Sequence, residues 1–216
     1  MKNKLIIISG ADSYRYDAHI NHQRYANIQG VDYKFHKSEN LPNPFFTKCY
    51  AILDSFNQGY EYVLWIDDDA FFINLDWDCT SIFKQYKEDV IVTKGRDKKS
   101  GITLFNNGIM FIRNTDNMKD LFTTIPNTQW KTIKRNWNLN WGPCLGNDQP
   151  RMIYLTQTRY PSAVKILDYP GFNAHESTFH TNKSFIETDP PIVHVTGNDK
   201  HRRIQRFTDN TGIPLP

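Results

Sequence analysis

The 216-residue sequence has no long hydrophobic run. Its first apolar segment, Leu5–Ile8, is far too short for a signal sequence or a membrane span. No later run approaches the roughly eighteen apolar residues that a spanning helix requires. We therefore expect a soluble, cytoplasmic protein without a membrane-spanning segment.

Cysteine is scarce and shows no paired spacing. The three cysteines, Cys49, Cys79 and Cys144, are odd in number and widely separated, and none belongs to a CxxC motif. This pattern argues against a disulfide framework and against a zinc knuckle. We expect all of them to be reduced thiols.

An excess of charge of one sign is also missing. Lysine and arginine number 26 against 23 aspartates and glutamates, which gives a formal net charge of +3. A charge this small does not indicate nucleic acid or a membrane surface unless the basic residues cluster. One cluster, Lys200, Arg202, Arg203 and Arg206, is compatible with a nucleic-acid patch or with a solvated helix beside a smaller anion.

Internal repeats, low-complexity tracts and linkers are absent, and the length suits one domain. In the first third of the chain, apolar strand-like runs alternate with helix-like stretches. This alternation predicts an α/β, Rossmann-like half with parallel strands and right-handed crossovers. The expected elements are a strand at Lys4–Ser9, a helix at Asp17–Gln29 closed by Gly30, a strand at Tyr33–His36, a helix at Thr47–Asn57 with Thr47 as its N-cap, and a strand from Tyr62.

The rest of the chain is less regular, and its elements are predicted one by one from short apolar runs and helical periods. The expected helices are Ser81–Lys87, Met118–Ile125, Asp148–Leu155 and Lys200–Phe207, and the expected strands are Val90–Thr93, Ile102–Phe105, Ile109–Ile112, Val164–Leu167 and Ile192–Val195.

The most informative stretch is Tyr62–Phe72. A short apolar run that ends in three acids predicts a buried strand of a parallel sheet. Ligands of open α/β sheets bind at the carboxyl edge, and residues two apart in an extended chain point the same way. Asp67 and Asp69 can thus converge on a divalent cation while Asp68 faces elsewhere. The alternative interpretation is a solvated acidic turn or helix cap.

A second stretch, from His194 to Lys200, has HxxGxxK spacing after an apolar strand. It places an imidazole, the approachable backbone of Gly197 and an ammonium group round one loop, which suits a metal-bound diphosphate. Taken alone, the histidine fits a hydrogen-bonded structural role better. Together with the acids at 67–69, the ligand-binding interpretation is favoured.

Three further segments allow two interpretations each. Asn106-Asn107-Gly108 suits a type I′ hairpin turn as well as a ligand loop. Asp148 can simply cap the helix that it begins. The Trp-rich segment Gln129–Gly142 follows neither a helical nor a strand period, and it suits either the core or a loop that stacks an acceptor sugar.

Taken in order, these motifs resemble those of GT-A-fold, metal-dependent, retaining glycosyltransferases. Two branches are similar: the glycogenin-like family and the galactosyl/xylosyltransferase family of mannan and xyloglucan synthesis. Gln29 stands where the second branch usually has histidine. The segments that carry the resemblance are Asp12-Ser13-Tyr14, Asn21 with Tyr25-Ala26 and Gly30, Thr47-Lys48, Trp65 through Ala70, Phe105 through Gly108, Asp148-Gln149, and His194 through Lys200.

The resemblance implies one GT-A domain, an α/β fold with a mixed, mostly parallel central sheet flanked by helices. Residues 1–70 would be the nucleotide-binding half that ends in the DxD motif, and residues 71–216 the donor-sugar and acceptor half. The implied reaction moves a hexose or pentose from UDP-glucose, UDP-galactose or UDP-xylose to a hydroxyl of a glycan or glycoconjugate acceptor, with retention of configuration. No nucleic-acid partner is implied.

The resemblance also assigns site residues. Asp67, Asp69 and His194 are the implied metal ligands, and an oxygen-rich set with one imidazole suits Mn²⁺ better than the alternative ion, Mg²⁺. Gln149, beside the anomeric carbon, and Asp148, on a sugar hydroxyl, are the implied catalytic pair. The implied donor-binding residues are Ser9, Gly10, Ala11, Tyr14 stacked on uracil, Lys48, Asp67, Asp68, Asn106, Asn107, Gly108, Gly197 and Lys200.

Two other functions fit parts of the sequence. A strand followed by DxD also begins phosphatases of the haloacid dehalogenase class, but here DxD follows the third expected strand and no later paired-acid loop is evident. A non-catalytic nucleotide-sugar binding module is the second alternative. The intact DxD, DQ and HxxGxxK motifs favour an enzyme.

Overall fold

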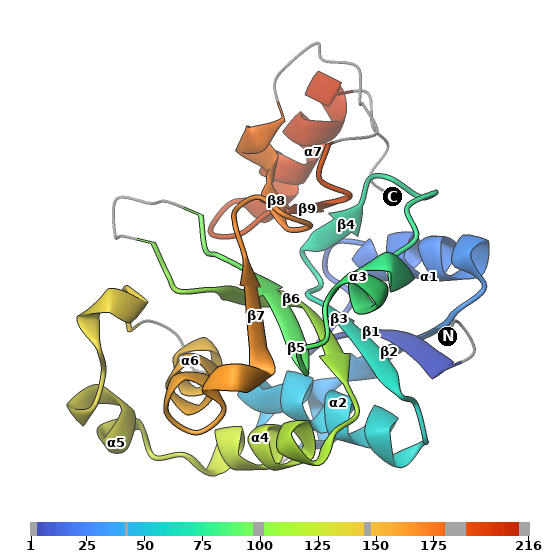
Figure 1. Cartoon of the computed structure of the whole chain (residues 1–216). Coiled ribbons are helices and arrows are strands. Elements are labelled where there is room, and N and C mark those ends of the chain that lie inside the picture. The colour runs from blue at the N-terminus through green and yellow to red at the C-terminus, as the bar shows by residue number, and fades with distance from the viewer. Residues whose placement is uncertain (1–3, 42, 97–101, 145–147, 180–188, 212–216) are drawn as a thin grey trace.

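A six-stranded sheet in the order β2-β1-β3-β6-β5-β7 runs through the centre of the protein, and a smaller sheet in the order β4-β9-β8 lies above it in Figure 1. The computed structural model describes residues 4–41, 43–96, 102–144, 148–179 and 189–211. The strands are β1 (Leu5–Ala11), β2 (Asp32–Lys37), β3 (Tyr62–Ile66), β4 (Ala70–Phe72), β5 (Val90–Thr93), β6 (Asn106–Arg113), β7 (Val164–Leu167), β8 (Ala174–His175) and β9 (Ile192–His194). The helices are α1 (Ala18–Gln29), α2 (Thr47–Asn57), α3 (Thr80–Gln85), α4 (Asp116–Asn127), α5 (Trp130–Arg135), α6 (Asp148–Thr158) and α7 (Lys200–Thr211).

Strand β6 runs against all the others of the large sheet. β1 is parallel to β2 and β3, and β5 is parallel to β7, whereas β6 is antiparallel to both β3 and β5. The prediction of a mixed, mostly parallel sheet is confirmed. Because β6 is reversed and Ile66 pairs with Ile109, residues 106–108 lie beside the acids that follow Ile66.

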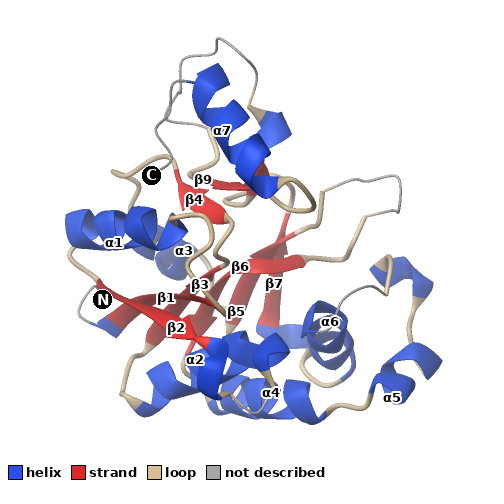
Figure 2. Cartoon of the chain, turned by 180° about the vertical axis from the view of Figure 1, so that it is seen from behind, coloured by secondary structure: helices blue, strands red, loops and turns tan. Residues whose placement is uncertain are grey.

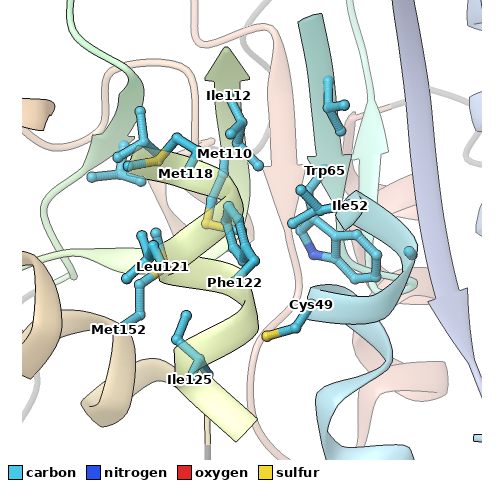
Figure 3. Close-up of a cluster of buried hydrophobic side chains, with 14 of the residues drawn as sticks. Cys49, Ile52, Trp65, Met110, Ile112, Met118, Leu121, Phe122, Ile125 and Met152 are labelled. Atoms are coloured by element: carbon cyan, nitrogen blue, oxygen red, sulfur yellow. The ribbon is translucent and has the colours of Figure 1, made fainter. Parts of the chain in front are cut away.

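The core is divided between the two faces of this sheet. On one face, Trp65 of β3 and Met110 of β6 pack with α2, α4 and α6 (Figure 3). On the other face, Leu64 and Phe111 of the same strands pack with α1 and α3. The two helical layers are seen below and above the strands in Figures 1 and 2. Both faces of β3 are therefore buried, which explains why its sequence has no polar alternation.

Helix α1 holds the chain beyond the acids through polar side chains. Asn21 donates to the Phe72 carbonyl at 2.9 Å and accepts from the Phe72 N–H at 2.7 Å, so its amide replaces a strand partner of β4. The His22 ring bonds the Ala70 carbonyl at 2.8 Å. Gln29 donates to a backbone carbonyl of the loop after β4. These bonds satisfy buried backbone groups and fix where β4 starts.

Helix α2 begins differently from the prediction. Thr47 is not its N-cap, because the helix starts at Thr47 and Phe46 occupies the capping position without a side-chain hydrogen bond. A 3₁₀ turn at Pro44–Phe46 leads straight into the helix. Gly30, by contrast, closes α1 with φ 65°, as predicted.

Two expectations about the segment before β6 are wrong. Residues 102–105 form no strand, since the Thr103 carbonyl accepts from the Gly95 N–H and the Leu104 N–H donates to the Trp141 carbonyl, and neither partner belongs to a strand. The hairpin-turn interpretation of residues 106–108 is also wrong, because they are the first residues of β6.

The Trp-rich segment supports the core interpretation in part. It forms α5 and a 3₁₀ turn at Leu139–Trp141, and Trp137 and Trp141 pack against the core below the sheet. The Trp137 Nε1–H donates to the Gly142 carbonyl at 2.8 Å. The acceptor-stacking interpretation stays a prediction.

Two broader expectations can be compared with the fold. No helix within the described ranges has the length and apolarity needed to cross a membrane. Cys49, Cys79 and Cys144 are thiols that form no disulfide, as predicted, and the first two are buried.

Candidate active site

The three acids follow β3 in a turn. The Ala70 N–H donates to the Asp67 carbonyl at 3.1 Å, which closes the turn, and β4 begins immediately afterwards. Asp67 and Asp69 converge as predicted. They do so in a turn, however, and not in the extended backbone on which the prediction was based. Asp68 is excluded from their group and pairs with the Arg15 guanidinium at 2.8 Å.

His194 completes the group around the acid turn. One ligand atom each from Asp67, Asp69 and His194 lies within 4.8 Å of the other two. His194 Nε2 is 3.0 Å from Asp69 Oδ1 and 4.0 Å from Asp67 Oδ2. Strand β9 delivers the imidazole because it pairs with β4, which places His194 opposite Ala70. Two carboxylates and one imidazole at this spacing could hold a divalent cation.

Gly108 leaves room for this group. A Cβ at Gly108 would lie 2.2 Å from His194 Cε1 and 2.9 Å from Asp67 Oδ2. The Gly108 carbonyl also accepts the Asp67 N–H at 2.8 Å, so β6 cannot move away without losing that bond. Only glycine allows the backbone to pass this close to the candidate ligands.

We expect Gly108→Ala to weaken Mn²⁺ binding by at least about tenfold, because the new methyl group must displace His194 or Asp67 and misplaced ligands bind a metal less well. Gly59→Ala is the matched control: Gly59 has φ 90°, and an added Cβ there meets no atom within 4 Å. It introduces backbone strain but leaves the site unchanged. Mn²⁺ calorimetry on both variants checks this, and parental affinity in Gly108→Ala would contradict the cation site.

Lys48 lies inside the site between two carboxylates. Its Nζ is 3.3 Å from Asp67 Oδ1 and 3.1 Å from Asp148 Oδ2, and it donates to the Asn107 carbonyl at 2.7 Å. The Lys48 side chain is buried, whereas a lone lysine near a helix start is normally solvated. Although burial favours the neutral amine, Asp148 and Asp67 hold the pKa of Lys48 above its ordinary value.

Asp148 and Gln149 both contact Asn107. The Asn107 side-chain amide donates to Asp148 Oδ2 at 2.8 Å, and the Asn107 backbone N–H donates to Gln149 Oε1 at 3.3 Å. The start of α6 is thereby joined to the start of β6. Burial opposes ionisation of Asp148, but Lys48 and the Asn107 amide hold the pKa of Asp148 below its ordinary value.

The acids of the turn differ in their electrostatic surroundings. Burial opposes ionisation of Asp69, yet His194 and Lys200 hold its pKa below the ordinary value; the Lys200 ammonium is 2.5 Å away. Burial, with help from Asp69, raises the pKa of Asp67 and raises that of Asp68 to about 6. A cation between Asp67 and Asp69 would offset this mutual repulsion.

The loop after β1 reaches the acid turn through Arg15, and Tyr14 lies in this loop. Tyr14 is half-exposed, and its ring centroid is 4.1 Å from that of His19 and 4.5 Å from that of Phe35. An aromatic ring therefore lies one residue from Arg15, the partner of Asp68, and its stacking on uracil stays a prediction.

Ser9, Gly10 and Ala11 form the end of β1 and lie within the packed sheet. The Ser9 hydroxyl is fully buried and bonded to the Tyr33 hydroxyl at 2.7 Å. A Cβ at Gly10 would be 2.7 Å from the His36 carbonyl oxygen. A ligand can therefore meet these residues mainly through their backbone.

The loop between β9 and α7 contains Gly197, whose φ is 102°. Arg203 donates to the carbonyls on both sides of this glycine, to Thr196 at 2.6 Å and to Asn198 at 3.1 Å. The guanidinium is also paired with Glu176. Arg203, a member of the basic cluster, therefore holds the loop between β9 and α7.

Asn173 adjoins the site and is missed by the sequence analysis. His194 Nδ1 is 3.2 Å from Asn173 Oδ1, and the Asn173 amide donates to Asn106 Oδ1 at 3.1 Å. The segment before the short strand β8 carries no spacing that indicates a ligand site. Only its contacts in three dimensions identify it.

No protein-family profile and no curated protein sequence matches this chain at a significant level. Solved structures do match it. A glycosyltransferase involved in the glycosylation of the major capsid of PBCV-1 aligns over 95% of this chain and 98% of its own, with a TM-score of 0.66 and 16% identity. Mouse xyloside xylosyltransferase 1, in its apo form, aligns over 99% of both chains with a TM-score of 0.53 and 10% identity. The chain has a GT-A-like fold.

The GT-A-like fold alone does not decide the reaction. The 4-diphosphocytidyl-2C-methyl-D-erythritol synthase of Anaerococcus prevotii DSM 20548 also matches, over 95% of this chain and 100% of its own, with a TM-score of 0.51 and 8% identity. Its name denotes a diphosphocytidyl product and not a glycoside. The fold prediction is confirmed, whereas the resemblance to the glycogenin-like and galactosyl/xylosyltransferase branches stays a prediction.

Proposed function

We propose that this protein is a metal-dependent, retaining glycosyltransferase that moves a hexose or pentose from UDP-glucose, UDP-galactose or UDP-xylose to a hydroxyl of a glycan or glycoconjugate acceptor. The observation that supports it best is that two polar groups at one edge of the GT-A-like sheet share Lys48. One group is Asp67, Asp69 and His194, and the other is Asn107, Asp148 and Gln149.

The first group would hold the cation and the donor diphosphate. A divalent ion bound there supplies Lewis-acid assistance to the departure of the diphosphate. Lys200 and the amide of Gly197 would share the remaining phosphate charge. Lys48 is more deeply buried than Lys200 and has two carboxylate partners, Asp67 and Asp148, where Lys200 has Asp69. We therefore assign Lys48 to positioning its two carboxylates and not to direct phosphate contact.

The second group would hold the donor sugar. Asp148 would accept a hydrogen bond from a sugar hydroxyl, Gln149 would lie beside the anomeric carbon, and Asn107 would keep both in place. The bond between the anomeric carbon and the diphosphate oxygen breaks and UDP leaves with the electron pair. The acceptor oxygen bonds the anomeric carbon on the same face, and its proton passes to the leaving phosphate.

The test of this proposal is the metal dependence of UDP binding. Without a cation the diphosphate would meet Asp67 and Asp69 directly, so we expect calorimetry to show UDP binding in Mn²⁺ and none in chelator. Equal affinity in both would contradict the proposal. A screen of nucleotide sugars with and without glycan acceptors then separates a transferase from a non-catalytic binding module, because only the transferase forms a glycoside and releases UDP.

Base recognition gives a separate prediction at Tyr14. We expect Tyr14→Ala to weaken UDP by about 1–3 kcal/mol, the range for one base stacked on one aromatic ring. Tyr14→Phe keeps the ring and should bind UDP like the parent. Calorimetry in Mn²⁺ measures both variants. If Tyr14→Ala keeps parental affinity, the base lies elsewhere, and Tyr16, whose ring is 5.6 Å from the Lys200 ammonium, is the next candidate.

A further inference from the structure

Asn173 connects the candidate metal ligand to the start of β6. It is buried, with 6% of its surface exposed, and its backbone N–H is fixed by the Pro170 carbonyl at 2.9 Å. The preceding Phe172 packs into the core, 4.8 Å from Phe111 between ring centroids. The backbone of Asn173, and with it the base of its side chain, is therefore fixed by contacts within the protein that need no ligand.

The hydrogen bonds determine which way each amide faces. The Gly108 N–H can only donate, and it lies 2.8 Å from the Asn106 side chain, so that atom must be Oδ1. The Asn173 atom 3.1 Å from the same Oδ1 must then be the NH₂ group. Its other end, Oδ1, is left facing His194 Nδ1 at 3.2 Å. An oxygen there requires that Nδ1 carry a proton.

We propose that Asn173 is a positioning residue that holds His194 with Nδ1 protonated and so aims Nε2 at Asp67 and Asp69. The inference rests on the cation site of the proposed function. A neutral histidine has one protonated ring nitrogen and one lone pair, and the partner of one nitrogen decides which of them binds a metal. With Nδ1–H donating to Asn173, Nε2 is the ligand atom.

The competing arrangement is visible in the same site. Asp69 Oδ1 lies 3.0 Å from His194 Nε2, and as a carboxylate it readily accepts a hydrogen bond from an N–H at that nitrogen. Without Asn173, the neutral ring would keep its proton on Nε2 and bond Asp69, which removes the lone pair from the cation. Asn173 opposes this arrangement. Because Asn173 is also bonded to Asn106, the orientation of the ring further depends on whether the first residues of β6 are held in place.

The experiment measures Mn²⁺ affinity and the state of the His194 ring. We expect Asn173→Ala to lower Mn²⁺ affinity by about 10- to 100-fold, the usual effect of losing the partner of a ligating histidine. Asn173→Asp keeps an oxygen at Nδ1 and should stay within about tenfold of the parent. In ¹⁵N-histidine protein loaded with diamagnetic Cd²⁺, His194 should show a metal-bound Nε2 and a slowly exchanging Nδ1–H, and this proton should exchange rapidly in Asn173→Ala.

Asn114→Ala is the matched control for general destabilisation. Asn114 follows the opposite end of β6, and its amide also makes two hydrogen bonds, to the carbonyls of Phe56 at 3.2 Å and Tyr60 at 2.8 Å. We expect it to reduce thermal stability without changing Mn²⁺ affinity or the His194 signals.

The outcomes separate this inference from the proposed function. Parental Mn²⁺ affinity in Asn173→Ala, metal bound at Nδ1, or an equal loss of affinity in Asn114→Ala would overturn the positioning role alone. If Mn²⁺ affinity depends on Asn173 as expected but the protein transfers no sugar, the positioning role is supported and the proposed function is overturned. A parent that binds no Mn²⁺ would overturn both.

Discussion

Asp69→Asn is expected to abolish Mn²⁺-dependent UDP binding and to reduce sugar transfer by about two to three orders of magnitude, the scale on which removing one stabilising group acts in a preorganised site. The substitution keeps the shape of the side chain but removes its charge. His194 and Lys200 both lie against this carboxylate, at 3.0 and 2.5 Å, so its charge organises one side of the cation group.

Asp68→Asn is the control for this prediction. The two acids are adjacent in the same turn, but Asp68 pairs with Arg15 and lies outside the group of candidate ligands. We expect Asp68→Asn to change Mn²⁺ affinity far less than Asp69→Asn. Calorimetry with Mn²⁺ and then UDP measures both steps, and circular dichroism shows whether each variant is folded. Similar Mn²⁺ affinity in Asp69→Asn and the parent would remove Asp69 from the metal site.

Much of the central architecture is predictable from the sequence because it depends on local patterns. The apolar run before Asp67 has no polar alternation, and such a run is typical of a strand covered on both faces. The β6 start reaches the same edge only because β6 is reversed, and no local pattern encodes that direction. The closeness of residues 106–108 to the acids after β3 was implied by the resemblance to a family, and no physical pattern in the sequence predicts it.

The parts that could not be predicted depend on tertiary partners. Residues 102–105 look like a strand by composition, yet their backbone bonds go to residues 95 and 141, which no local rule brings near. A lone lysine near a helix start is normally solvated, and only the positions of Asp67 and Asp148 in the fold show that Lys48 lies between two carboxylates. Asn173 is an ordinary loop residue until its amide is found between His194 and Asn106.

Gln149→Ala is expected to separate binding from chemistry. If Gln149 lies beside the anomeric carbon, its amide matters mainly in the transition state, so UDP affinity should stay near the parental value while single-turnover transfer falls by about 100-fold. His194→Ala should instead lose UDP affinity and transfer together, because it acts on the diphosphate through the cation. Rapid-quench single turnover and calorimetry on the two variants give the comparison.

Gln157→Ala tests whether the effect of Gln149 is local. Both glutamines belong to α6, and residues eight positions apart in a helix are separated by about 12 Å along its axis. Gln157→Ala should therefore leave UDP binding and transfer unchanged.

Gln149 also accepts the Asn107 N–H at 3.3 Å, so its loss can disturb the β6 start as well as the sugar. If Gln149→Ala transfers at the parental rate, or loses UDP as strongly as His194→Ala, then its assignment is wrong, and the residue beside the anomeric carbon must be sought first at Asn106 and next in the Trp-rich segment.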